Sequence, residues 1–164
     1  MERNESITLR AAHATEAAAI AAMSRLQVEY GLRWRWTPAR VRQSIRDRET
    51  MVLVASMDGV IEGFAIMKFR DSSAHLMLLA VAPGSRRAGI GTALLRWLES
   101  SCRTAGIFRV RLEVRAGNLD ARRFYRRRGY RVVGQIAGYY DRREAATVMV
   151  ADLRCGANNA TQIE

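Results

Sequence analysis

The chain has 164 residues, of which 49% are apolar, so it is long enough to bury a core as one domain and too apolar for a disordered chain. Its two cysteines and two histidines show no metal-ligand spacing, and no apolar stretch is long enough to span a bilayer. The formal net charge of +11 favours anionic partners. With no signal pattern near the N-terminus, we expect a soluble, cytoplasmic domain over residues 1–153, a polar tail over residues 154–164, no metal and no membrane contact.

The first part of the chain predicts one strand and two helices. A strand is expected over residues 6–12, and a helix runs from Thr15 and Glu16 to about Tyr30. Thr37 and Pro38 predict a second helix start, because threonine caps free amide groups and proline fits the first helical position. A basic and aromatic segment, residues 32–36, links the two helices.

The remainder predicts three consecutive strands, then helices alternating with strands. The strands over residues 50–57 and 60–70 are joined by Asp58 and Gly59, a strong hairpin signal, and a third strand covers residues 74–82. Helices are expected over residues 89–105 and 118–128, and strands over residues 107–115, 130–137 and 145–153. This order predicts a mixed sheet in which the strand–helix–strand unit forms one parallel pair.

The turn after the strand over residues 74–82 predicts an anion site. Gly84, Gly89 and Gly91 let the backbone approach a ligand closely, and the helix that follows presents free amide groups and a positive dipole end. An ordinary glycine-rich turn is the alternative. The spacing matches neither the phosphate loop of nucleotide hydrolases nor the dinucleotide fingerprint.

This segment resembles the (Q/R)xxGx(G/A) signature of the GNAT superfamily of N-acetyltransferases, with Arg86, Gly89 and Gly91 at the signature positions. The resemblance implies a GNAT-type α/β fold, with a mixed, mostly antiparallel seven-stranded sheet and about four helices on its faces. It also implies acetyl-CoA as co-substrate, its pantetheine arm paired with the strand backbone and its pyrophosphate held by loop amides. The cofactor-binding residues so implied are Leu79, Ala80, Val81, Arg86, Arg87, Ala88, Gly89, Ile90, Gly91 and Thr92.

A second segment, residues 112–130, resembles the LEVRxxNxxAxxxYxxxG(F/Y) block of RimI-like enzymes, which acetylate protein N-terminal amines. In those enzymes the matching tyrosine protonates the CoA thiolate and the asparagine contacts the cofactor, which implies these roles for Tyr125 and Asn118. The two residues are seven positions apart, so they lie on one side of a helix. A core tyrosine packed on Ala121 and Phe124 is the alternative.

Glu113 is the candidate catalytic base. It lies among arginines on one face of an alternating strand, and the matching glutamate of RimI-like enzymes deprotonates the amine. The alternative is an ion pair with Arg111, Arg115 or a cross-strand arginine, which would lower the basicity of Glu113. Tyr139 and Tyr140, expected after the sixth strand, match a substrate-binding pair that shapes the peptide slot. The family's Arg-Asn before the pair and proline after it are missing, and an edge-strand aromatic pair is the alternative.

The leading hypothesis is therefore direct transfer of acetyl from acetyl-CoA to a primary amine in a ternary complex. The expected acceptor is a protein N-terminal α-amine, with a ribosomal context, and the chain is expected to be a monomer or homodimer. A small-molecule amine is the second hypothesis. The third is a nucleic-acid-binding module, for which Arg33, Trp34, Arg35 and Trp36 form the one stretch of interleaved basic and aromatic residues. The arginines between Arg122 and Arg131 are read as a solvated face, or as contacts to CoA or an acidic or ribosomal partner.

Overall fold

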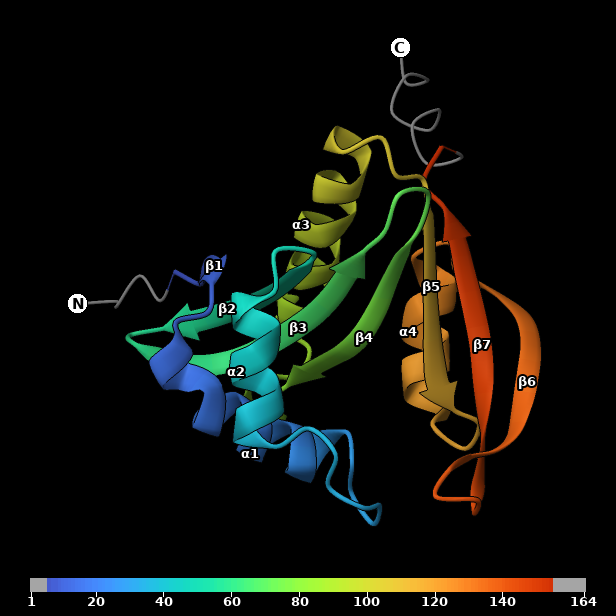
Figure 1. The fold of residues 1–164 in the computed structure, drawn as a ribbon, viewed down its shortest axis with the longest axis horizontal. Helices are drawn as coiled ribbons and strands as arrows, with labels where there is room; N and C mark the ends of the chain where they lie inside the picture. The colour runs from blue at the N-terminus through green and yellow to red at the C-terminus, as the bar shows by residue number, and fades with distance from the viewer. Residues whose placement is uncertain (1–5, 155–164) are drawn as a thin grey trace. The chain divides into compact units, whose positions relative to one another are not determined.

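A computed structural model describes residues 6–154, which form seven strands and four α-helices (Figure 1). The sheet is mixed and mostly antiparallel, with strand order β1-β2-β3-β4-β5-β7-β6 and β4 parallel to β5. The predicted fold class is therefore confirmed. The elements are β1 (Thr8–Ala11), α1 (Ala17–Gln27), α2 (Pro38–Arg46), β2 (Thr50–Met57), β3 (Val60–Phe69), β4 (Ala74–Val81), α3 (Ile90–Thr104), β5 (Arg109–Arg115), α4 (Leu119–Arg127), β6 (Arg131–Tyr140) and β7 (Glu144–Asp152).

Local signals in the sequence set several of these boundaries. The Thr37 side chain accepts a hydrogen bond from the Arg40 amide and caps α2 as expected. Asp58 and Gly59 both have positive φ, at 50° and 80°, and form the tight turn between β2 and β3. The predicted polar tail lies outside the described residues, except for Arg154.

Helix α1 ends three residues before the predicted Tyr30, because a buried carboxylate holds the chain that follows it. Glu29 accepts hydrogen bonds from the Ser24 hydroxyl at 3.1 Å, the Arg35 amide at 2.7 Å and the Trp36 amide at 3.2 Å. Only 8% of Glu29 is exposed, so these bonds are well shielded from water. The expected helix start is also shifted, because residues 14–16 form a 3-10 turn before α1.

The chain groups into two compact units. Unit 1 comprises residues up to 69 together with residues 77–98, and unit 2 comprises residues 70–76 together with residues 99 onwards. In unit 1, α1 and α2 cover one face of the strands and α3 covers the other (Figure 1). The core under α1 and α2 includes Ile20, Val41, Val54, Phe64 and Ile66.

Gly63 on β3 allows α3 to pack closely in unit 1. A Cβ added at Gly63 meets the Ala80 carbonyl oxygen at 3.0 Å, the Ile90 Cγ2 at 3.0 Å and the Leu94 Cδ1 at 3.3 Å. The first of these atoms belongs to the backbone of β4, which cannot rotate out of the way. Any larger residue at this position must therefore displace the strand or the helix.

We expect Gly63→Ala to lower the free energy of unfolding by about 1–3 kcal/mol, the usual cost of overpacking. Urea denaturation measures this. Gly134→Ala on β6 is the matched control, because no atom lies within 4 Å of its added Cβ and its φ is not positive. If both variants unfold at the same urea concentration as the wild type, the close packing at Gly63 does not make a larger residue there destabilising.

Unit 2 contains β5, β7 and β6 side by side, the first residues of β4, and α4, which lies behind β5 in Figure 1. Alternation along β5 buries Val110, Leu112 and Val114, while Glu113 and the arginines face the other way. β6 extends to Tyr140, three residues beyond the predicted end. Tyr139 and Tyr140 therefore lie within this edge strand, because Tyr140 pairs with Glu144 after a register shift.

Candidate functional site

The turn between β4 and α3 has the backbone shape expected of an anion site. A 3-10 turn, Pro83–Ser85, follows β4, and the chain then takes positive φ at Arg87, 69°, and at Gly89, 79°. The first intrahelical backbone bond runs from the Ala93 amide to the Gly89 carbonyl at 2.9 Å. The amide groups at the start of α3 thus precede the helical hydrogen-bond ladder, which is the arrangement by which helix N-termini bind anions.

Side chains of unit 1 anchor this turn. The Ser85 hydroxyl donates to the Glu62 carboxylate at 2.5 Å, and the Ala82 amide donates to the Glu62 carbonyl at 2.8 Å. The Arg86 guanidinium donates to the Gln27 side chain at the end of α1 at 2.6 Å. These bonds hold residues 82–86, while residues 87–89 of the turn are exposed.

The predicted pantetheine-binding stretch of β4 alternates in burial. The Ala80 side chain is packed in the core, whereas Leu79 and Val81 are half-buried. The Ala80 side chain is thus not available to a ligand.

In unit 2, Glu113 is the centre of a hydrogen-bonded group. Its carboxylate contacts His75 Nε2 at 2.5 Å and accepts from Arg111 Nε at 2.9 Å. His75 and Arg111 are register partners in the parallel β4–β5 pair, which brings the imidazole onto the face that carries Glu113. The Glu113 side chain is 8% exposed and that of His75 is 34% exposed, so only the imidazole reaches solvent to any extent.

Opposing effects act on the Glu113 carboxyl. Burial favours the neutral acid, but the hydrogen bonds and charges of His75 and Arg111 outweigh it, so the pKa of Glu113 is lowered. Glu113 is therefore ionised at neutral pH, and the His75 nitrogen facing it must carry the hydrogen. The second ring nitrogen, Nδ1, has no hydrogen-bond partner among residues 6–154 and remains available to accept a proton.

Tyr125 is the one buried residue of α4. Its ring makes edge contacts with Phe124, at 5.2 Å between centroids, and with Tyr130, at 5.6 Å. Burial raises the pKa of Tyr125, so the phenol stays protonated across the physiological range. The packing on Phe124 that the alternative interpretation expects is thus present, and burial preserves the proton that a donor requires.

Asn118 caps α4, since its Oδ1 accepts from the Ala121 amide at 3.1 Å. The carbonyl oxygen of this side chain is therefore committed to the helix. The amide nitrogen has no hydrogen-bond partner among the described residues, which leaves it available for a ligand.

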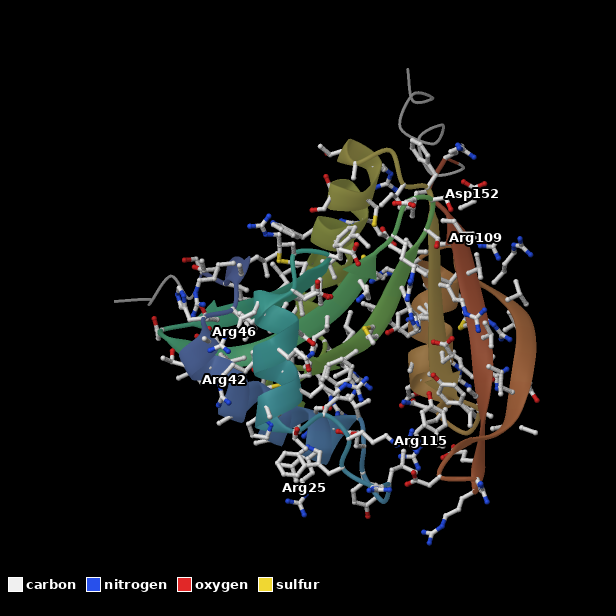
Figure 2. All side chains as sticks on the ribbon, viewed as in Figure 1. Arg25, Arg42, Arg46, Arg109, Arg115 and Asp152 are labelled. Atoms are coloured by element: carbon white, nitrogen blue, oxygen red, sulfur yellow. The ribbon has the colours of Figure 1, made fainter. Side chains whose placement is uncertain are left out.

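Tyr139 and Tyr140 pack edge to face, with 4.9 Å between ring centroids. Burial, the Tyr139 phenol and the Glu113 carboxylate together raise the pKa of Tyr140. Arg115, at the end of β5, donates to Glu144 at 2.6 Å, and Glu144 is the register partner of Tyr140. Figure 2 shows Arg115 at one end of β5 and Arg109 beside Asp152 at the other.

Residues 18–130 match the acetyltransferase (GNAT) family. The chain belongs to this family.

Three relatives illustrate the range of the family. An uncharacterized N-acetyltransferase from Methanocaldococcus jannaschii is 40% identical over 98 residues, which cover 59% of this chain and 63% of that protein. The N-alpha-acetyltransferase from Sulfurisphaera tokodaii is 28% identical over 124 residues, 68% of this chain and 74% of that protein. Streptothricin acetyltransferase from Streptomyces lavendulae is 34% identical over 96 residues, 57% of this chain and 50% of that protein. The chain thus spans a little under two thirds of the first of these relatives.

Two solved structures share the GNAT fold over 90% of this chain. Ard1 from Thermoplasma volcanium has a TM-score of 0.80 and 26% identity, with 97% of that chain covered. The ribosomal-protein-S18-alanine N-acetyltransferase from Escherichia coli has a TM-score of 0.79 and 24% identity, with 94% covered.

The basic and aromatic segment of residues 32–36 does not present open aromatic rings. Trp36 is buried, and the Arg40 guanidinium lies 3.9 Å from its ring centroid. Trp34 packs against the core beneath Arg25, so neither indole is an open stacking platform for bases.

Cys102 is buried as expected, and burial raises the pKa of its thiol to about 11. Over residues 6–154, no three His, Cys, Asp or Glu side chains are grouped to hold a metal, and no helix is long and apolar enough to cross a membrane.

His75 is the residue that sequence reasoning missed. Its position on β4 alternates with the buried Leu76 and Leu78, so a face shared with half-buried Leu79 was readable from the sequence. Its pairing with Glu113, which is 38 positions away, was not readable, because it depends on the register of the parallel strands.

Proposed function

We propose that the protein is an acetyl-CoA-dependent N-acetyltransferase whose acceptor is a protein N-terminal α-amine. One observation carries the proposal: unit 2 holds both an ionised Glu113 hydrogen-bonded to a half-exposed imidazole and a buried, protonated Tyr125. Direct transfer to an amine requires one group that accepts a proton and one that donates a proton. The resemblance to the N-alpha-acetyltransferase from S. tokodaii supports the acceptor class.

The residues present fit acetyl-CoA. The positive φ at Gly89 and the exposed backbone beside Arg86 and Arg87 form a cradle suited to a pyrophosphate, next to the amide groups of α3. Acetyl-CoA supplies the acetyl group as an activated thioester. The role of this chain is to bind it through residues 79–81 and 86–92, to place the amine, and to move protons.

The amine proton goes to the Glu113–His75 pair. A carboxylate whose pKa is lowered is a weak base toward an ammonium group, so Glu113 by itself has little driving force. Its better role is to hold His75 in the tautomer that leaves Nδ1 open as a proton acceptor. This assigns the base function predicted for Glu113 to the pair.

The departing sulfur receives its proton from Tyr125. Its phenol is protonated and shielded from water, and Asn118 at the start of the same helix offers its amide nitrogen to the cofactor. Tyr139 and Tyr140 line the acceptor slot in this proposal. A RimI-like preference, a ribosomal acceptor, a cytoplasmic location and a monomeric or homodimeric state stay predictions.

A small-molecule amine is the second candidate acceptor, favoured by the likeness to streptothricin acetyltransferase. Polycationic amines are disfavoured by the net charge of +11. Acetyl-CoA turnover against an N-terminal peptide library and a panel of small amines separates the two. Transfer to peptides with a free α-amine, and not to the same peptides with a blocked N-terminus, is the expected result. Turnover with small amines alone contradicts the proposed acceptor.

His75→Gln is expected to lower the rate of transfer about tenfold at pH 7 and by less than about twofold at pH 9. The loss should not exceed these values because an α-amine has a pKa of about 7.7–8.0. Roughly a tenth of the amine is already neutral at pH 7, and nearly all of it is neutral at pH 9, so little deprotonation is left for the enzyme to assist. The measurement is kcat/KM across this pH range. A loss that is equal at both pH values indicates a structural role for His75 instead.

A further inference from the structure

We infer that the β6–β7 hairpin selects acceptor peptides that carry an acidic side chain at the second to fourth position, through Arg142 and Arg143. The inference rests on the proposed α-amine acceptor and adds the class of peptide. Both arginines are exposed, and neither forms an ion pair with any residue from 6 to 154.

The hairpin tip is a preformed loop. Its backbone is held by the Arg142 amide, which donates to the Gly138 carbonyl at 3.0 Å, and by the Arg143 amide, which donates to the Tyr140 carbonyl at 2.9 Å. Asp141 and Arg142 both have positive φ, at 52° and 59°, an uncommon conformation for residues with side chains. The two guanidinium groups are therefore presented from an ordered turn directly after Tyr140.

On the neighbouring strand β5, two arginines are already matched by acidic partners. Arg115 is paired with Glu144 at 2.6 Å, and Arg111 is paired with Glu113 at 2.9 Å. The tip, residues 141–143, contains one acidic residue, Asp141, and the two arginines. An acidic side chain from a ligand would complete the balance, whereas a basic side chain would be repelled.

The register of β5 against β7 gives the distance from the Glu113–His75 pair to the hairpin tip. Glu113 pairs with Val148, and β7 begins four positions earlier at Glu144, the residue that follows the tip. At about 3.3 Å per strand residue, this is about 13 Å. An extended peptide with its amine at the Glu113–His75 pair covers that distance in about four residues, and the length of an arginine side chain shortens it.

The surrounding charge favours the same partner. The described part of unit 2, residues 70–76 and 99–154, has fourteen arginines, no lysine and seven Asp and Glu residues, a net charge of +7. This field attracts acidic peptides in general, while the hairpin adds the position dependence.

The test compares peptides that begin with alanine and carry one Glu, Gln or Lys at position two, three or four, all else being equal. We expect kcat/KM for the best Glu peptide to exceed that of its Gln counterpart at least about tenfold at low salt, as for a charge-assisted contact. High salt should reduce the ratio. In R142Q/R143Q the ratio should fall below about twofold, with acetyl-CoA affinity and the Gln-peptide rate retained.

R42Q/R46Q is the matched control, because it removes two exposed arginines from α2 in unit 1 and should keep the Glu preference (Figure 2). Equal rates for Glu and Gln peptides in the wild type overturn the inference but leave the proposed function intact. A preference that survives in R142Q/R143Q overturns the assignment to the hairpin. If no peptide is acetylated while small amines are, the proposed acceptor itself fails.

Discussion

Tyr125→Phe is expected to lower the single-turnover rate of acetyl transfer about 100-fold, the lower end of what a positioned general acid contributes. This corresponds to ~2.7 kcal/mol at the barrier. Acetyl-CoA affinity should hardly change, because a phenyl ring keeps the edge contacts to Phe124 and Tyr130. Rapid-quench kinetics with the best peptide acceptor, together with separately measured binding, checks this.

Tyr130→Phe is the matched control. The Tyr130 hydroxyl donates to the buried Glu99 carboxylate at 3.1 Å, so its loss leaves a buried acceptor short of a partner. The expected cost is about 1–3 kcal/mol of stability with the chemical rate retained. For Tyr125→Phe we expect the opposite result, a lower chemical rate with little loss of stability. A Tyr125→Phe enzyme that keeps more than about a third of the wild-type rate, under ~0.7 kcal/mol by the same conversion, is incompatible with Tyr125 as the acid.

Gly89→Asp is expected to abolish measurable acetyl-CoA binding while the protein stays folded. The change places a carboxylate beside the proposed pyrophosphate cradle and a side chain at a φ of 79°, which favours glycine. The site has open space around the added Cβ, so no clash with the core is introduced. Isothermal titration calorimetry with acetyl-CoA, and circular dichroism for the fold, provide the measurement.

Gly89→Asn separates charge from backbone strain, because asparagine has the shape of aspartate and tolerates positive φ. We expect it to bind acetyl-CoA more weakly than the wild type and more tightly than the Asp variant. Gly91→Asp, two residues further on, should also lose binding. Unchanged affinity in both Asp variants would remove the phosphate-binding role from this turn.

Much of the fold was predictable because the signals are local. Asp58 and Gly59 make their turn from their own backbone preferences, and Thr37 caps α2 through an amide three residues away. The alternation of β5 separates Glu113 from the buried Leu112 and Val114 whatever the rest of the chain does. The spacing of Arg86, Gly89 and Gly91 likewise identifies the family from a few neighbouring residues.

Contacts between residues far apart in the sequence decided the remainder. The register of β4 against β5 brings His75 to Glu113, and the hydrogen bonds to buried Glu29 end α1 before its helical pattern does. The pairing of Tyr140 with Glu144 extends β6 through the tyrosine pair. In each case the local preference of the segment differs little between the alternatives, and a buried hydrogen bond or a strand pairing to a distant residue is strong enough to select one of them.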